Sequence, residues 1–329
     1  MTVEKGAPVT RVVTDVGTYE ADADWARVPL GWSFREVAGV ATDSRSRVYV
    51  FSRGAHPMMV FDRDGEFVAS WGEGAFAKAH NVRVSPDGFL FCSDMRDHTV
   101  RKFTLEGELV MTLGTPNAPS DTGGDGRDVK IKRSAGPFNG PTDVAFGPSG
   151  ELYVTDGYAN ARVHRFSADG RLVSSWGAPG GRPGEFNLPH NALIDGETLY
   201  VADRENNRVQ VFDLGGGFVA EWTDFAGPTG ISLGADGNLL VSEFGYDPAV
   251  RTRYSVPSHG RRILPRLTLR SREGELLAKI EGEDKCAPGS FFAPHTVCVD
   301  GSGDIYVGEV PITRNSPGPC HTLQKLVRL

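Results

Sequence analysis

The sequence predicts an all-β fold, and specifically a six-bladed β-propeller. A short apolar run with a tyrosine-like centre recurs six times along the 329 residues. An Arg-Val or Thr-Val pair follows it in three copies, and a glycine turn follows it in most. Such short runs between turn-forming residues are typical of strands. No window of about 10 to 15 residues has convincing helical periodicity. The central residues of the six copies are Tyr49, Phe91, Tyr153, Tyr200, Leu240 and Tyr306.

The copies divide the chain into the blades of one domain, residues 1–329. Four strands in each repeat of roughly 40 to 60 residues are typical of propeller blades, which bury their faces against one another. The expected blades span approximately residues 31–72, 73–114, 139–177, 186–222, 227–280 and 291–329. One strand-like segment, residues 10–19, precedes the first copy. We expect this N-terminal strand to close the last blade, because pairing would cover an exposed edge.

Two long insertions interrupt the repeats, at residues 115–138 between the second and third blades and at residues 244–262 inside the fifth. Long loops in a compact domain are usually functional or disordered. In a four-stranded meander, the connection between blades and the connection from second to third strand emerge on one face. We therefore expect both insertions to rim the same mouth of the central channel.

Histidines recur at one position of every second copy. The residues eleven places before each central residue, or ten places in the fourth copy, are Ala38, His80, Thr142, His190, Thr229 and His295. This position begins the innermost strand, so three imidazoles should converge on the channel axis. Three histidines with an open coordination position are the arrangement of catalytic zinc, although iron or manganese is also possible. The alternative is that these histidines are hydrogen-bonded channel residues without a metal. His56, His98, His164, His259 and His321 lie outside this register and are interpreted as surface or loop residues.

Other polar residues follow the second strand of several copies. Arg53, Tyr158 and Arg204 lie four or five places after the central residue and should reach the same mouth. An arginine close to a phenol favours phenolate, which makes tyrosine a usable general base beside a metal. One step earlier, an acidic residue recurs in five copies, which favours turn or blade-stacking hydrogen bonds over catalysis. These acidic residues are Asp94, Asp156, Asp203, Glu243 and Glu309.

Composition narrows the classes of partner. The net charge of -7 and the lack of a basic run argue against nucleic acid. No apolar run reaches the roughly 18 residues of a membrane span, and the N-terminus lacks the apolar core of a signal peptide, so a cytoplasmic location is expected. The four cysteines have no Cys-X-X-Cys spacing, and free thiols are preferred, with a Cys286–Cys320 disulfide left open.

The chain resembles NHL-repeat propellers, and within them the peptidyl-α-hydroxyglycine α-amidating lyases. The segments that carry the resemblance are VYVFSRGAH around Arg53, PTDVAFGPSGELYVTDGYANARVHRFS around Tyr158, FNLPHNALI with YVADRENNRVQVF, and FFAPHTVCVDGSGDIYVGE around His295. The resemblance implies that His80, His190 and His295 bind zinc. It also implies that Tyr158 is the base and that Arg53 tunes it and steers the substrate.

The reaction implied by the resemblance cleaves a carbinolamide, N–CH(OH)–COO⁻, into an amide and glyoxylate. The partner would be a small-molecule substrate, with an upstream hydroxylating enzyme as its possible source. In the family a methionine stands at the position of Ala293, and a calcium-binding aspartate stands at the position of Thr296, which puts a structural calcium ion in doubt.

Two other functions are compatible with a six-bladed propeller. A metal-dependent lactonase or esterase usually has carboxylate and amide ligands at the axis, which the three histidines disfavour. A non-catalytic NHL scaffold for protein or RNA generally exposes a basic or aromatic face, which this acidic chain lacks.

Overall fold

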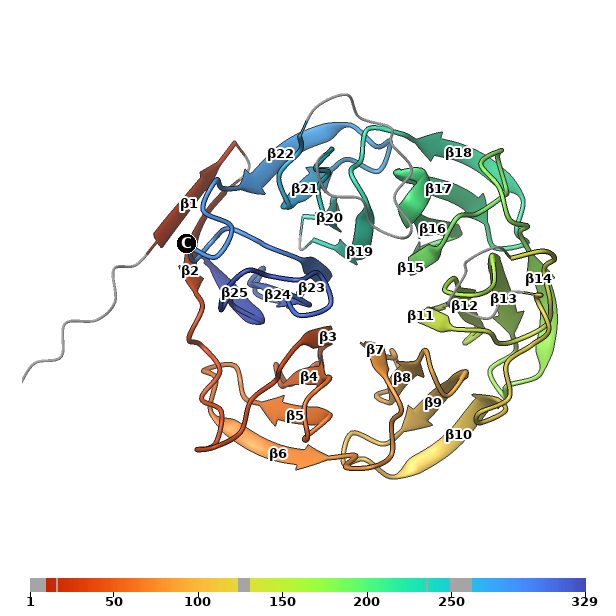
Figure 1. The fold of residues 1–329 in the computed structure, drawn as a ribbon, viewed down its shortest axis with the longest axis horizontal. Helices are drawn as coiled ribbons and strands as arrows, with labels where there is room; N and C mark the ends of the chain where they lie inside the picture. Colours follow the sequence, from red (N-terminus) through yellow and green to blue (C-terminus); the bar gives the residue numbers. More distant parts are fainter. Residues whose placement is uncertain (1–9, 16, 124–130, 235, 249–261) are drawn as a thin grey trace, which may run out of the picture.

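The computed structural model describes residues 10–15, 17–123, 131–234, 236–248 and 262–329. Six antiparallel sheets stand around a central axis, and the first strand of each blade is the innermost (Figure 1). The structure therefore confirms the all-β, six-bladed propeller. Among the described residues the helical content is the 3-10 turn η1 (Arg204–Asn206), and no helix there is long and apolar enough to cross a membrane.

The first three blades are four-stranded meanders. Blade 1 contains β3 (Val37–Thr42), β4 (Val48–Ser52), β5 (Met58–Phe61) and β6 (Phe67–Trp71). Blade 2 contains β7 (Ala79–Val84), β8 (Leu90–Asp94), β9 (Thr99–Phe103) and β10 (Leu109–Gly114). Blade 3 contains β11 (Pro141–Phe146), β12 (Leu152–Asp156), β13 (Arg162–Phe166) and β14 (Leu172–Trp176).

The last three blades complete the ring. Blade 4 contains β15 (Pro189–Asp195), β16 (Thr198–Asp203), β17 (Arg208–Asp213) and β18 (Phe218–Trp222). Blade 5 contains β19 (Pro228–Leu233), β20 (Leu239–Glu243), β21 (Arg266–Arg270) and β22 (Leu276–Glu281). Blade 6 contains β23 (Pro294–Val299), β24 (Ile305–Glu309), β25 (Leu323–Arg328), β2 (Gly17–Asp22) and β1 (Thr10–Thr14).

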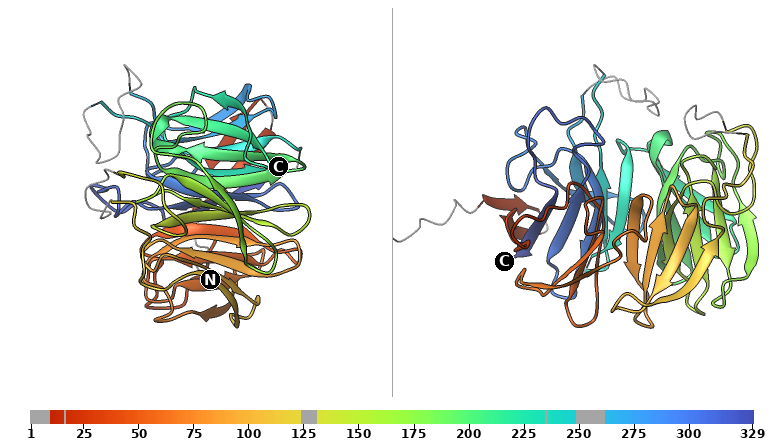
Figure 2. Two further views of the ribbon diagram at one scale, coloured as in Figure 1. Left: turned by 90° about the vertical axis from the view of Figure 1, so that its right-hand side faces the viewer. Right: turned by 60° about the horizontal axis from the view of Figure 1, so that its bottom comes forward.

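An N-terminal strand closes blade 6, as the sequence predicts. The closing strand is β2, which pairs antiparallel with β25 from Tyr19 opposite Arg328 to Asp22 opposite Lys325. The single segment expected at residues 10–19 is a hairpin, whose other strand, β1, lies at the outer edge of the blade (Figure 2). The chain forms two strands because Asp15, a turn-forming residue directly after Thr14, lies in the turn between them.

The strands become less buried from the axis of the propeller to its rim. Second strands such as β4, β12 and β24 are wholly buried, since both of their faces meet neighbouring blades. Their central residues Tyr49, Tyr153 and Tyr306 are 0% exposed. Outermost strands are largely exposed, so the recurring apolar run marks the part of each blade that packs against the next.

The glycine turns and the tryptophans of the repeat pack against each other between blades. Gly107, in the turn before β10, has a φ of +94°, and a Cβ there would lie 2.6 Å from the Trp71 ring of blade 1. Equivalent close approaches join Gly216 to Trp176 and Gly274 to Trp222. Only glycine fits such a contact, which accounts for its recurrence one blade after a tryptophan.

Removing the closing strand should destabilise the whole ring. A variant that lacks residues 1–22 loses both β1 and β2 and leaves the β25 edge unpaired. We expect its midpoint of thermal unfolding, measured by circular dichroism, to fall by roughly 10 °C or more, as a loss of several kcal/mol would produce. A variant that lacks residues 1–15 keeps β2 and should lose much less. Equal losses in the two variants would contradict the closing role of β2.

Candidate metal centre

The innermost strand of every blade contains the same irregularity. Pairing with the second strand skips one residue near its start, as between Pro189 and Asn191 in blade 4. A β-bulge of this kind redirects the side chain of the extra residue. The skipped residues of the six blades are Ala38, His80, Thr142, His190, Thr229 and His295. The register found in the sequence is therefore the bulge position.

The three histidines meet in the channel. Their ring centroids are 4.7 Å apart for His80 and His190, 4.8 Å for His80 and His295, and 4.7 Å for His190 and His295. The triangle is nearly equilateral, as expected for identical positions in alternate blades. One nitrogen from each ring lies within 4.8 Å of the others, and all three side chains are buried. Three converging neutral nitrogen donors are a ligand set for a transition metal.

Each imidazole is oriented by the next blade. Nδ1 lies 2.6 Å from the Thr142 carbonyl oxygen for His80, 2.7 Å from that of Thr229 for His190, and 2.8 Å from that of Ala38 for His295. A carbonyl only accepts, so Nδ1 carries the hydrogen and Nε2 has the free lone pair. Hydrogen bonds of this kind fix the tautomer of metal-binding histidines.

The small residues between the histidines also have a structural role. Thr142 Oγ1 donates to the Pro189 carbonyl at 2.8 Å, and Thr229 Oγ1 donates to the Pro294 carbonyl at 2.7 Å. Those carbonyls belong to the residues immediately before His190 and His295. The backbone carbonyl of each threonine therefore accepts a hydrogen bond from the histidine of the preceding blade. Its hydroxyl donates to the backbone just before the histidine of the following blade.

The free ring nitrogens are suited to a metal. Nε2 of His190 and Nε2 of His295 are buried without a hydrogen-bond partner in the described part of the chain. Burial, the largest cause, holds the pKa of all three imidazoles well below its ordinary value. The rings are consequently neutral at physiological pH, as ligands must be. A buried lone pair without a partner is costly, and a bound cation would remove that cost.

Tyr158 and Arg204 lie next to this cluster. The Tyr158 hydroxyl is 3.2 Å from Nε2 of His80, and the Arg204 guanidinium carbon is 5.7 Å from the centre of the Tyr158 ring. Arg204 begins η1, is 5% exposed, and its Nε donates to Glu205 Oε1 at 2.8 Å. A phenol therefore stands between one imidazole and a buried guanidinium.

Arg53 occupies a different side of the mouth. Its Nη1 forms an ion pair with Glu36 Oε2 at 3.0 Å and donates to Thr313 Oγ1 at 3.0 Å. Its charge, after burial, helps to lower the pKa of His80. The structure thus brings Arg204 close to the Tyr158 ring, while Arg53 pairs with Glu36.

The recurring acidic residues fix the chain that leads into the innermost strands. Asp94 accepts hydrogen bonds from the backbone amides of Ala77 and Lys78, at 2.6 and 3.0 Å. Asp156, Asp203, Glu243 and Glu309 accept equivalent bonds in their own blades. Their structural role, preferred from the sequence, is confirmed.

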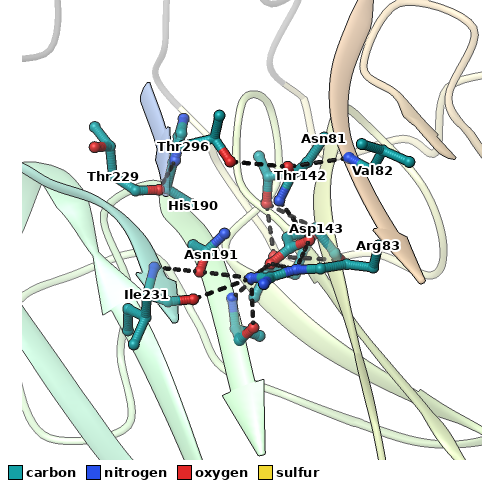
Figure 3. A network of polar contacts seen from close by, with 12 residues as sticks. Asn81, Val82, Arg83, Thr142, Asp143, His190, Asn191, Thr229, Ile231 and Thr296 are labelled. Atoms are coloured by element: carbon teal, nitrogen blue, oxygen red, sulfur yellow. Dashed lines mark hydrogen bonds and ion pairs between the residues drawn. The ribbon is translucent and has the colours of Figure 1, made fainter. Parts of the chain in front are cut away.

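An arginine whose side chain is 19% exposed joins four blades next to the histidines, and no sequence pattern described above predicts it. Arg83, on β7, donates from Nη2 to Asp143 Oδ2 at 2.7 Å, to Asn191 Oδ1 at 3.0 Å, and to the carbonyls of Ala192 and Ile231 at 3.1 and 3.3 Å (Figure 3). Four blades therefore share one guanidinium. The equivalent positions of the other copies are Ala41, Ala145, Leu193, Ser232 and Cys298, so a lone charge at this register was the available signal.

Two further expectations are corrected. His164, interpreted as a surface or loop residue, is 0% exposed on β13, where Nδ1 lies 2.7 Å from Ser175 Oγ and Nε2 lies 3.3 Å from Asp156 Oδ2. Cys286 and Cys320 form a disulfide, whereas Cys92 and Cys298 are free. The pairing was hidden because 34 residues separate the two cysteines.

Of the two insertions, residues 124–130 and 249–261 lie outside the described residues, as does His259.

Fold and site together define a six-bladed propeller with a three-histidine cluster in its channel. The model of the NHL repeat matches residues 138–166 and 186–212. NHL repeat-containing protein 3 of Mus musculus is 30% identical over 259 residues, which cover 72% of this chain and 72% of that protein. The chain belongs to the NHL-repeat family.

The amidating proteins are also similar to this chain. Peptidylglycine alpha-amidating monooxygenase of Rattus norvegicus is 32% identical over 228 residues, covering 59% of this chain and 22% of that protein. Peptidyl-alpha-hydroxyglycine alpha-amidating lyase 1 of Drosophila melanogaster is 29% identical over 274 residues, covering 75% and 45%. The chain thus spans only about a fifth of the rat protein. A streptogramin B lyase structure, 15% identical with a TM-score of 0.59, covers 94% of this chain and 98% of its own and shows the same fold.

Loss of Arg83 should lower the stability of the protein, and a second substitution should restore part of it. Arg83→Met leaves the Asp143 carboxylate buried without its counter-charge, so we expect a loss of about 3–5 kcal/mol in the free energy of unfolding, measured with denaturant. Adding Asp143→Asn removes the uncompensated charge and should recover part of that loss. A double variant no more stable than Arg83→Met would contradict the charge pairing.

Proposed function

We propose that this chain is a metal-dependent lyase that cleaves the C–N bond of a small α-hydroxylated amide. The observation that carries the proposal is the oriented triad, with two unpartnered Nε2 atoms beside a phenol. His80, His190 and His295 would hold the metal, most plainly zinc, for which three neutral histidines are a catalytic ligand set. The similarity to proteins named amidating lyases supports the choice of reaction.

The chemistry needs an acid–base group and charge stabilisation. When bound, a divalent metal supplies Lewis acidity, which makes a substrate hydroxyl easier to deprotonate. Tyr158, as phenolate, would accept that proton, and Arg204 beside its ring would stabilise the phenolate charge. The carbonyl then forms as the C–N bond breaks, and the proton passes from Tyr158 to the leaving nitrogen. The products are an amide and an aldehyde such as glyoxylate.

The substrate carboxylate would meet Arg53. The Arg53 side chain is 10% exposed, and its charge contributes to the lowered pKa of His80. Its Nε donates to the Ala79 carbonyl at 3.1 Å and its Nη1 contacts Glu36, so Nη2 would donate to the substrate carboxylate. Because the substrate carries a hydroxyl on the carbon next to nitrogen, an upstream hydroxylating enzyme would have to supply it.

Metal content tests the ligand assignment. We expect purified protein to contain about one equivalent of zinc or another divalent transition metal per chain, and His190→Ala to lose most of it, because removal of one of three ligands weakens binding strongly. Elemental analysis measures both. His321→Ala, a histidine outside the cluster, should keep its metal. Metal-free wild-type protein with unchanged stability would favour a non-catalytic scaffold.

Turnover tests the reaction and the base. Release of glyoxylate from α-hydroxyhippurate should be measurable in the metal-loaded protein. Tyr158→Phe should lower kcat by roughly 10²- to 10⁴-fold, the usual contribution of a general acid–base group, while metal content stays unchanged. Full activity in this variant would refute the assignment of the base. Hydrolysis of lactones without glyoxylate release would instead favour the lactonase or esterase class.

A further inference from the structure

A cavity of about 330 Å³ opens beside the metal centre, among blades 4, 5 and 6. Arg204 and Phe244 belong to its wall, and these two residues also border the catalytic cluster. The Arg204 guanidinium approaches Tyr158, and the Phe244 ring centre lies 6.3 Å from that of His295. A molecule bound at the histidines could therefore extend into this cavity without crossing the ring of blades.

The cavity has an excess of positive charge. Arg204, Lys285 and Arg314 line it, together with the carboxylates of Glu205 and Asp247. Glu205 pairs with Arg204, and Asp247 lies 3.9 Å from Arg262. Within the described ranges, neither Lys285 nor Arg314 has a carboxylate within ion-pair distance.

Arg314 packs against the Phe244 ring. Its guanidinium carbon lies 4.6 Å from the centre of the Phe244 ring, and that of Arg204 lies 5.4 Å from the same centre. Burial, followed by the nearby charge of Arg204, lowers the pKa of Arg314. Two guanidiniums close to one aromatic ring repel each other, Glu205 offsets part of this repulsion, and a bound anion would offset more of it.

The disulfide holds the two unpaired cations on the same side of blade 6. Cys286 directly follows Lys285, before β23, and Cys320 lies in the β24–β25 connection that carries Arg314. The two segments are otherwise separate loops. A covalent bond between them limits how far Lys285 and Arg314 can move apart, as a preformed binding site requires.

We propose that this cavity is an anion-binding subsite for the acyl part of the substrate, with Arg314 as its main specificity-determining residue. The substrate class is then an N-acyl-α-hydroxyglycine whose acyl group carries a second carboxylate. The order of groups, with the hydroxylated carbon at the histidines and the acyl group in the cavity, rests on the proposed function. The charge preference of the cavity does not.

Binding of uncleavable probes tests the subsite without turnover. Hippurate and 4-carboxyhippurate lack the hydroxyl group and differ by one carboxylate on the benzoyl ring. Calorimetry on the metal-loaded protein should show at least roughly tenfold tighter binding of 4-carboxyhippurate, the ratio that one charged hydrogen bond provides. Arg314→Met should abolish this preference while hippurate affinity stays within about twofold. Arg171→Met removes the same charge from the exposed β13–β14 turn and should change nothing.

The outcomes separate the two proposals. A preference for 4-carboxyhippurate that depends on Arg314, without glyoxylate release from either hydroxylated compound, would keep the subsite and reject the lyase. Glyoxylate release with equal affinity for both probes would overturn the subsite. If Arg314→Met unfolds at a lower temperature, Arg314→Gln provides the second variant, because it removes the charge and keeps a polar side chain. An unchanged preference for 4-carboxyhippurate in Arg314→Gln would locate the anion elsewhere and overturn the assignment.

Discussion

The hydrogen bond from Nδ1 of each histidine to the carbonyl of the next blade is the constraint on which the centre depends. It joins neighbouring innermost strands at their bulges, and it settles the tautomer and the direction of all three rings. The accepting residues are Ala38, Thr142 and Thr229, so each bond runs from a histidine to a small residue of the next blade, and six blades provide three imidazoles.

Arg83 and the three-histidine cluster occupy neighbouring parts of the channel. The triad presents nitrogen lone pairs, while the atoms around Arg83 are a carboxylate, an amide oxygen and two carbonyls. Oxygen atoms arranged in this way stabilise a positive charge, and here the Arg83 guanidinium provides that charge. The guanidinium also ties β7 to β11, β15 and β19, so the backbone that carries His80, Thr142 and His190 is held from a common point. The three-histidine cluster and the polar network around Arg83 are therefore two parts of one axial structure.

Much of this arrangement follows from local sequence, because each blade repeats the same short-range geometry. The bulge lies at a nearly fixed distance before the centre of the second strand, so His80, His190 and His295 could be aligned without a structure. The partners of Arg83 could not, since they come from three other blades. The sequence also could not decide between Arg53 and Arg204, because both follow a second strand and only the direction of the following loop separates them. His164 lies outside the register of the three histidines, which predicts a surface or loop position, whereas hydrogen bonds with Asp156 and Ser175 stabilise it inside blade 3.

The closure of blade 6 by β2 has a consequence for biosynthesis. A ribosome releases β2 early and β25 more than 300 residues later, so the edge of β2 has no partner until nearly all of the described chain has emerged. His295 belongs to that same last sheet, and the histidines are more than 100 residues apart along the chain. The ligand set is complete only when the ring is closed. A metal ion would then be captured by a folded ring and would not act as the nucleus around which the nascent chain collapses.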